Sequence, residues 1–180
     1  MSILAGPFTI AAALLVVGGG LKALRPGDTA HALGAVGLPL PRALPRRALV
    51  RVGGATEAVV GIGALVTGGP VFAALVAVSY AGFAAFVVVA LRRNAPISSC
   101  GCFGKVDTPP STVHVVIDGI AAVVATAAAF VGGVALPDVL RDQPLAGVPY
   151  LALCAIGVSL VFLSFTALPR TLSAVREVTA

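Results

Sequence analysis

Five apolar segments, each long enough to cross a lipid bilayer, take up most of the sequence and limit the folds open to it. A transmembrane helix needs about 20 predominantly apolar residues. The segments cover residues 3–24, 48–67, 71–91, 111–136 and 150–168. Charged residues make up only 11% of the chain, whereas a soluble domain carries about 25%. Such a chain cannot cover a water-exposed surface, so we expect an all-α integral membrane protein.

The connecting segments are too short for a separate soluble domain, and we expect one membrane domain over residues 1–180. Asp28 is the expected N-cap of a short helix over residues 28–36. That helix is too short to cross the bilayer and is expected to lie at its interface. Residues 94–110 form a polar loop, and Ser111 is the expected N-cap of the fourth span.

Basic residues are distributed unevenly between the two ends of the predicted bundle. With five spans, the first connection, the 94–110 loop and the C-terminal tail share one side of the membrane. That side collects eleven of the twelve basic residues: Lys22, Arg25, Arg42, Arg46, Arg47, Arg51, Arg92, Arg93, Lys105, Arg170 and Arg176. Only Arg141, in a polar loop over residues 137–149, lies opposite. The positive-inside rule therefore places the N-terminus of this multi-pass membrane protein outside and the 94–110 loop in the cytoplasm.

Two cysteines separated by a single glycine form the most distinctive polar motif of the chain. Cys100 and Cys102 lie in the sequence SSCGCFG, residues 98–104. The glycine gives the backbone freedom to close a small disulfide ring, and strained disulfides exchange readily with thiols. Two thiolates at this spacing can instead bind a soft metal ion such as Cu(I), with His114 as a third ligand. Two cysteines packed in a loop without chemistry are the third alternative.

Glu57, His114 and Asp118 lie inside the predicted spans, where a charged side chain costs about 2.5–3.5 kcal/mol on insertion scales. Glu57 is in the second span, and either has a functional role, is a partner for Arg51, or makes a buried hydrogen bond to a neighbouring helix. His114 and Asp118 are four residues apart at the start of the fourth span, so they share one helix face. Asp118 can also serve only to complement the helix dipole.

Glu57, His114 and Asp118 lie in the same leaflet as the two cysteines. If the second and fourth spans touch, the three side chains converge beneath the loop. His114 can then act as a base for a cysteine thiol, which favours the reactive thiolate.

The sequence SCGCFG, followed by proline, serine and histidine at the start of a helix, resembles the methylamine-utilisation MauE family, which is related to the DoxX-like four-helix membrane proteins. Gly20-Leu21-Lys22 at the end of the first span, Leu38-Pro39 and Glu57 fit the same pattern. The resemblance covers residues 8–135. It implies a four-helix DoxX/MauE-like core to which this chain adds a fifth transmembrane helix.

The resemblance also implies a role in membrane-bound redox chemistry. MauE-like proteins are associated with thioredoxin-like partners and with disulfide formation in the small subunit of methylamine dehydrogenase. Cys100 and Cys102 match the redox pair of the family motif, and Glu57 is a secondary match.

We therefore expect a membrane thiol–disulfide relay that exchanges electrons with a thioredoxin-fold partner. Cys100, Cys102, His114, Glu57 and Asp118 are its expected site residues, and its cofactor is a redox-active disulfide. The sequence leaves open whether a quinone also binds, and whether the chain is an oxidoreductase or an accessory redox protein. A copper- or zinc-binding membrane protein and a non-catalytic scaffold subunit are the alternatives. The basic residues at helix ends, with a net charge of +5, do not indicate a nucleic-acid partner.

Overall fold

The computed structural model describes residues 3–37, 45–93, 110–133 and 135–167, which form helices and no strands. The helices are α1 (Ala5–Leu24), α2 (Gly27–Val36), α3 (Arg46–Val66), α4 (Pro70–Arg92), α5 (Thr112–Phe130), α6 (Leu136–Arg141), the 3-10 helix η1 (Pro144–Gly147) and α7 (Val148–Thr166). By length and composition, α1, α3, α4, α5 and α7 can each cross a membrane. The prediction of an all-α fold with five spans is therefore confirmed.

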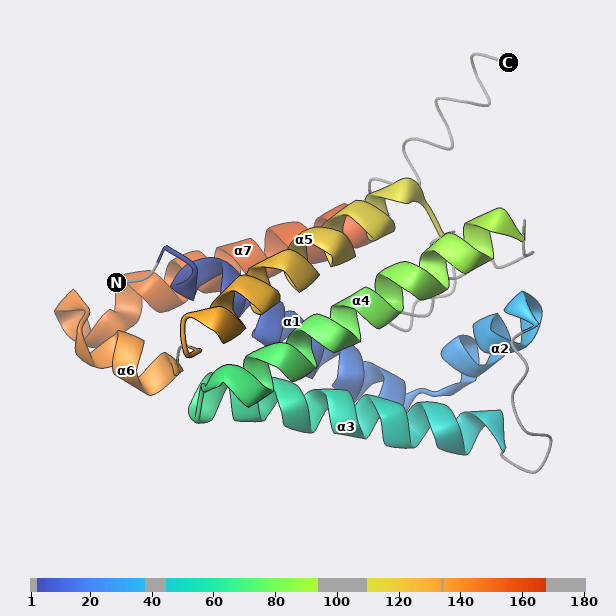
Figure 1. Ribbon diagram of the computed structural model, residues 1–180, viewed down its shortest axis with the longest axis horizontal. Helices are drawn as coiled ribbons and strands as arrows, with labels where there is room; N and C mark the ends of the chain where they lie inside the picture. Colours follow the sequence, from blue (N-terminus) through green and yellow to red (C-terminus); the bar gives the residue numbers. More distant parts are fainter. Residues whose placement is uncertain (1–2, 38–44, 94–109, 134, 168–180) are drawn as a thin grey trace, which may run out of the picture.

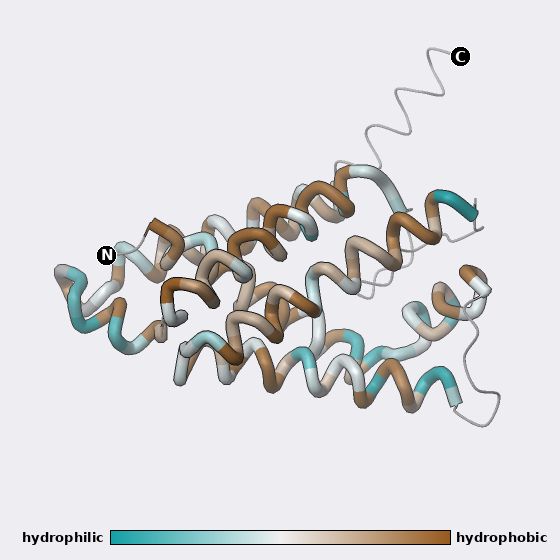
Figure 2. The backbone as a smooth tube through the Cα atoms, viewed as in Figure 1, coloured by the Kyte–Doolittle hydropathy of each residue, from teal (hydrophilic) through white to brown (hydrophobic). Residues whose placement is uncertain are grey.

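The five long helices extend along the length of the bundle, with α2 at one end and α6 at the other (Figure 1). Helix α1 packs closely against α3 and also contacts α5 and α7, while α4 packs against α5. Figure 2 shows the most hydrophilic residues at the two ends of the bundle, around α6 and at the ends of α3 and α4. This arrangement makes α1 the central helix.

The core is built mainly from small side chains, which allow close helix packing. Its buried members are Phe8, Ala11, Ala12, Leu15, Val60, Ala64, Ala73, Val76, Ala77, Tyr80, Ala125 and Ala128. One buried hydrogen bond crosses it, from the Tyr80 hydroxyl to the Ala11 carbonyl oxygen at 2.8 Å. Large apolar residues such as Val59, Val78 and Val123 point outward, each at least 65% exposed. An outer surface of this kind suits lipid chains rather than water.

The connection between the fourth and fifth spans differs from the sequence-based expectation. Helix α5 ends at Phe130 instead of continuing to residue 136, because Gly132 and Gly133 have positive φ angles of 94° and 77°. The region expected to be a loop over residues 137–149 contains α6 and η1. Each has a proline in its first turn, Pro137 in α6 and Pro144 in η1, where the missing N–H is tolerated.

Helix α2 lies over nearly the residues predicted, but its N-cap is Pro26, and Asp28 lies in the first turn instead. Gly37 ends the helix with a left-handed φ of 68°. Arg93, at the end of α4, donates hydrogen bonds through Nη1 to the carbonyl oxygens of Val36 at 2.6 Å and Gly37 at 3.2 Å. One guanidinium group therefore fastens the end of α2 to the end of α4.

Replacing Arg93 with alanine is expected to loosen α2 and leave the rest of the bundle intact. Hydrogen bonds from charged donors contribute about 1.5–3 kcal/mol when buried and less at an exposed position. Amide hydrogen exchange in α2 should therefore become roughly five- to tenfold faster. Arg92→Ala removes the same charge from the exposed neighbouring residue and is the control. Equal exchange in both variants would contradict the anchoring role of Arg93.

Candidate functional site

The site begins where α1 and α3 approach each other at two glycines. A Cβ atom on Gly19 would lie 2.6 Å from the Gly54 carbonyl oxygen, and one on Gly54 would lie 2.6 Å from the Gly19 carbonyl oxygen. Real Cβ contacts are essentially never shorter than 3.0 Å. Only glycine fits at either position, and the two backbones meet without intervening side chains.

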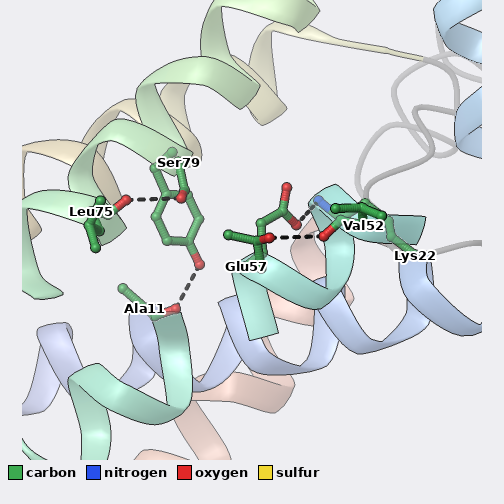
Figure 3. Close-up of polar contacts among 8 residues, drawn as sticks. Ala11, Lys22, Val52, Glu57, Leu75 and Ser79 are labelled. Carbon is green, nitrogen blue, oxygen red and sulfur yellow. Dashed lines mark hydrogen bonds and ion pairs between the residues drawn. The ribbon is translucent and has the colours of Figure 1, made fainter. Parts of the chain in front are cut away.

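Lys22 and Glu57 each lie three residues after one of these glycines and face each other across the helix contact (Figure 3). The Lys22 ammonium pairs with Glu57 Oε2. Lys22 is only 7% exposed, and its Nζ lies 3.9 Å from the centroid of the Phe83 ring. A desolvated ammonium group over an aromatic face gains additional cation–π stabilisation. The α1–α3 contact therefore supports a buried, charge-compensated pair.

A cavity of about 220 Å³ lies next to this pair, between the ends of α1, α2, α3 and α4. Lys22 and Glu57 contribute its charged groups, and Phe83 and Phe86 contribute aromatic rings. The remaining lining residues are Thr29, Leu33, Leu49, Val50, Gly53 and Gly54. The lining that the described residues provide is thus apolar except for one ion pair and one threonine.

His114 and Asp118 lie on one face of α5, as predicted, and each is only 2% exposed. Ser111 occupies the N-cap position of α5. Its hydroxyl makes a 2.9 Å hydrogen bond with His114 Nδ1 instead of capping the backbone. The imidazole also packs on Phe165 of α7, with ring centroids 5.3 Å apart. The histidine is therefore held in place from two sides.

Asp118 lines a second, smaller cavity of about 20 Å³ together with Lys22, Tyr80, Phe83 and Phe165. A space of about 10–15 Å³ is enough for one water molecule. Asp118 Oδ2 is buried and has no hydrogen-bond partner among the described protein atoms. Lys22 and Phe83 line both cavities. Lys22 therefore lies between the two carboxylates, paired with Glu57 on one side and lining the Asp118 cavity on the other.

The structure brings the predicted residues together differently from the sequence-based expectation. We expected the side chains of Glu57, His114 and Asp118 to converge through direct contact of the second and fourth spans. Instead, Lys22 of α1 pairs with Glu57 and also lines the cavity of Asp118. The alternative that Arg51 is the partner of Glu57 is wrong, because Lys22 holds that position and Arg51 is exposed. Within the described ranges, no three His, Cys, Asp or Glu residues are grouped so as to hold a metal ion.

Cys100 and Cys102 lie outside the described residues, so both the dithiol and the metal alternative remain predictions. The described chain stops just after α4 and resumes just before α5, and these two helix ends lie at the end of the bundle that carries α2 (Figure 1). The segment with the two cysteines is therefore attached at the end where Lys22 and the first turn of α5 are found. Cys154, the third cysteine, is a buried free thiol in α7.

Sequence reasoning treated Lys22 as an orienting charge at the end of a span and did not assign it to the site. A signal was present in the spacing: Gly19 precedes Lys22 by three residues, and Gly54 precedes Glu57 by three residues. Two helices that cross at the glycines bring the two charges together. Phe83 carried no comparable signal, because one phenylalanine in an apolar helix resembles any other.

Comparison with known proteins gives one match. A family model described as "Methylamine utilisation protein MauE" matches residues 1–136 of the 180-residue chain. The matched region contains the described residues from α1 to α5, including Lys22, Glu57, His114 and Asp118, together with the two cysteines. No curated protein and no solved structure matches the chain significantly.

Proposed function

The chain belongs to the MauE family of methylamine utilisation proteins, and on that premise we propose that it is a membrane thiol–disulfide relay. Cys100 and Cys102 cycle between dithiol and disulfide and exchange electrons with a thioredoxin-fold partner. The observation that carries the proposal is the attachment of the Cys-Gly-Cys segment at the end of the bundle where buried ionisable side chains gather. Buried charges in membrane proteins are costly and usually mark functional sites.

The exchange proceeds through two balanced steps. One cysteine thiolate attacks a sulfur of the partner's disulfide, forms a mixed disulfide and releases the partner's other sulfur as a thiolate. The second cysteine then attacks the mixed disulfide, closes the ring and releases the partner's dithiol. The chain loses two electrons, and the two protons of its thiols pass to the partner's sulfurs. The reverse direction uses the same steps.

His114 is proposed to assist proton transfer because it lies in the first turn of α5, close to where the 94–109 segment ends. Its hydrogen bond to Ser111 fixes the orientation of the ring. Asp118, one turn deeper on the same face, accepts or returns protons from within the bundle. Glu57 is compensated by Lys22 and sets the local charge instead of supplying a free base.

The distribution of charge supports a cytoplasmic location for the α2 end of the bundle. Exposed basic residues gather there: Arg25, Arg46, Arg47, Arg51, Arg92 and Arg93. At the opposite end, Arg141 is paired with Asp138 at 3.2 Å. We propose the topology with the N-terminus outside and the cysteines on the cytoplasmic side of the bacterial inner membrane, in agreement with the positive-inside rule.

Replacing either cysteine tests the relay. Cys100→Ser and Cys102→Ser should each abolish disulfide exchange, measured with purified full-length protein in detergent and reduced thioredoxin as the probe partner. Thioredoxin lacking its resolving cysteine should be trapped as a mixed disulfide. Cys154→Ser is the matched control and should retain exchange, because this thiol is buried in α7. Full activity in both Cys100→Ser and Cys102→Ser would rule out the relay.

Labelling in intact cells tests the topology separately. A membrane-impermeant maleimide should modify Cys100 and Cys102 only after the membrane is permeabilised. Labelling from the outside would place the pair on the extracytoplasmic face and reverse the proposed orientation while leaving the relay itself standing.

A further inference from the structure

The exchange steps make no use of the cavity beside Lys22 and Glu57. We propose that this cavity binds the ring of a lipid-soluble quinone. The binding site is inferred from the cavity alone, whereas its role as an electron acceptor rests on the proposed relay. The described residues place this cavity at the same end of the bundle as the attachment points of the Cys-Gly-Cys segment.

The charges in the cavity favour a neutral ligand. Among the described residues, Lys22 and Glu57 are the ionisable members of its lining, and they compensate each other. A phosphate or carboxylate ligand would add a negative charge beside a lysine that Glu57 already compensates, and burying an uncompensated ion costs several kcal/mol. A neutral molecule with oxygen acceptors can bind while the pair remains intact.

The ion pair can recognise both redox states of a quinone. An ammonium group has three N–H donors, and Lys22 directs one to Glu57, so it can also donate to a quinone carbonyl oxygen. A carboxylate has several acceptor positions, so Glu57 can accept a hydrogen bond from a quinol hydroxyl. Other neutral lipids present hydroxyl or ester groups but lack paired ring oxygens that change from acceptors to donors.

The walls of the cavity suit an aromatic ring with an apolar tail. Phe83 and Phe86 supply two phenyl rings for offset stacking or edge contacts. Leu33, Leu49 and Val50 add aliphatic surface. Leu49 and Gly53 of α3 both line the cavity and are exposed, so we infer that it can be reached from the outside of the bundle along α3. A prenyl tail can leave by this opening into the bilayer.

Quinone chemistry also balances the relay. When Cys100 and Cys102 close to a disulfide, the dithiol gives up two electrons and two protons. A quinone takes up two electrons and two protons to become a quinol. A thioredoxin-fold protein could then be oxidised repeatedly, with the membrane quinone as the terminal acceptor.

The decisive variant fills the cavity without disturbing the helix contacts. Gly53 lines the cavity, and a Cβ atom there would meet no atom within 4 Å. Gly53→Leu should therefore fold and project its side chain into the cavity. Gly82 on α4 is also exposed, has equal space around a Cβ atom and does not line the cavity. Gly82→Leu is the matched control.

The measurement is calorimetric titration of purified full-length protein in detergent with a ubiquinone that carries one isoprenoid unit. The native chain and Gly82→Leu should bind with the same affinity, and Gly53→Leu should bind at least tenfold more weakly. Equal binding by the two leucine variants, or no saturable binding by the native chain, would overturn the proposal. Competition by dioleoylglycerol as strong as that by the quinone would show a general lipid cavity and also overturn it.

The same titration separates this proposal from the relay. A Cys100→Ser/Cys102→Ser double variant should bind the quinone with unchanged affinity although its thiol exchange is lost. Quinone binding without thiol exchange in the native chain would remove the relay and keep the binding site. Thiol exchange without quinone binding would remove the binding site and keep the relay.

Discussion

Lys22→Met is expected to destabilise the protein by about 3–5 kcal/mol, because removing one partner of a buried ion pair leaves the other charge uncompensated. The Lys22 side chain is 8% exposed and that of Glu57 is 19% exposed, so both charges are largely shielded from bulk water. The cation–π contact with Phe83 is lost at the same time. Chemical unfolding of the purified protein in mixed micelles measures the effect.

A double variant and a neighbouring control distinguish loss of pairing from loss of the lysine itself. Lys22→Met/Glu57→Leu removes both charges and should recover most of the lost stability, since apolar replacements of buried pairs are often neutral or stabilising. Arg25→Met removes an exposed basic residue three positions further along and should change the free energy of unfolding by less than about 0.5 kcal/mol. If the double variant is less stable than Lys22→Met alone, the pair does not account for the loss.

Gly54→Ala is expected to destabilise the protein by about 1–3 kcal/mol, the usual range for inserting a methyl group into a tightly packed contact. The added Cβ would lie 2.6 Å from the Gly19 carbonyl oxygen and 2.8 Å from the Ala23 nitrogen. Because both are backbone atoms, α1 and α3 must move apart. The same unfolding measurement applies.

The adjacent glycine gives a control with the identical chemical change. A Cβ on Gly53 meets nothing within 4 Å, so Gly53→Ala should be neutral or stabilising by up to about 1 kcal/mol through helix propensity. Separation of the helices should also weaken the ion pair. Lys22→Met should therefore cost less in the Gly54→Ala background than in the native one. Purely additive effects would show that the glycine contact and the ion pair are independent.

The sequence alone was sufficient to predict the spans, because the apolar runs and the low charge content leave lipid as the only suitable solvent. The sequence was less informative between α5 and α7. The short polar, proline-rich stretch there predicts a loop, but it contains the two short helices α6 and η1. The shared face of His114 and Asp118 followed from helical spacing. Their burial could be confirmed only once α1 and α7 were placed against α5.

The partner of Glu57 shows why the rest of the site could not be read from local sequence. Arg51 and Glu57 are six residues apart on α3, whereas helix neighbours on one face are three or four apart. The true partner, Lys22, is on another helix. Because it lies in the last turn of α1, we grouped it with the basic residues that flank the spans. Its burial depends on the crossing of α1 and α3, which is a tertiary property.

The pairing of Lys22 with Glu57 also has a consequence for how the chain is made. Synthesis proceeds from the N-terminus, so the lysine emerges from the ribosome 35 residues before the glutamate that compensates it. During that interval the charge sits in the last turn of an otherwise apolar helix with no acidic partner from α3. We therefore expect α1 to reach its final depth in the bilayer only when α3 inserts beside it, so that the two helices enter the membrane as a pair.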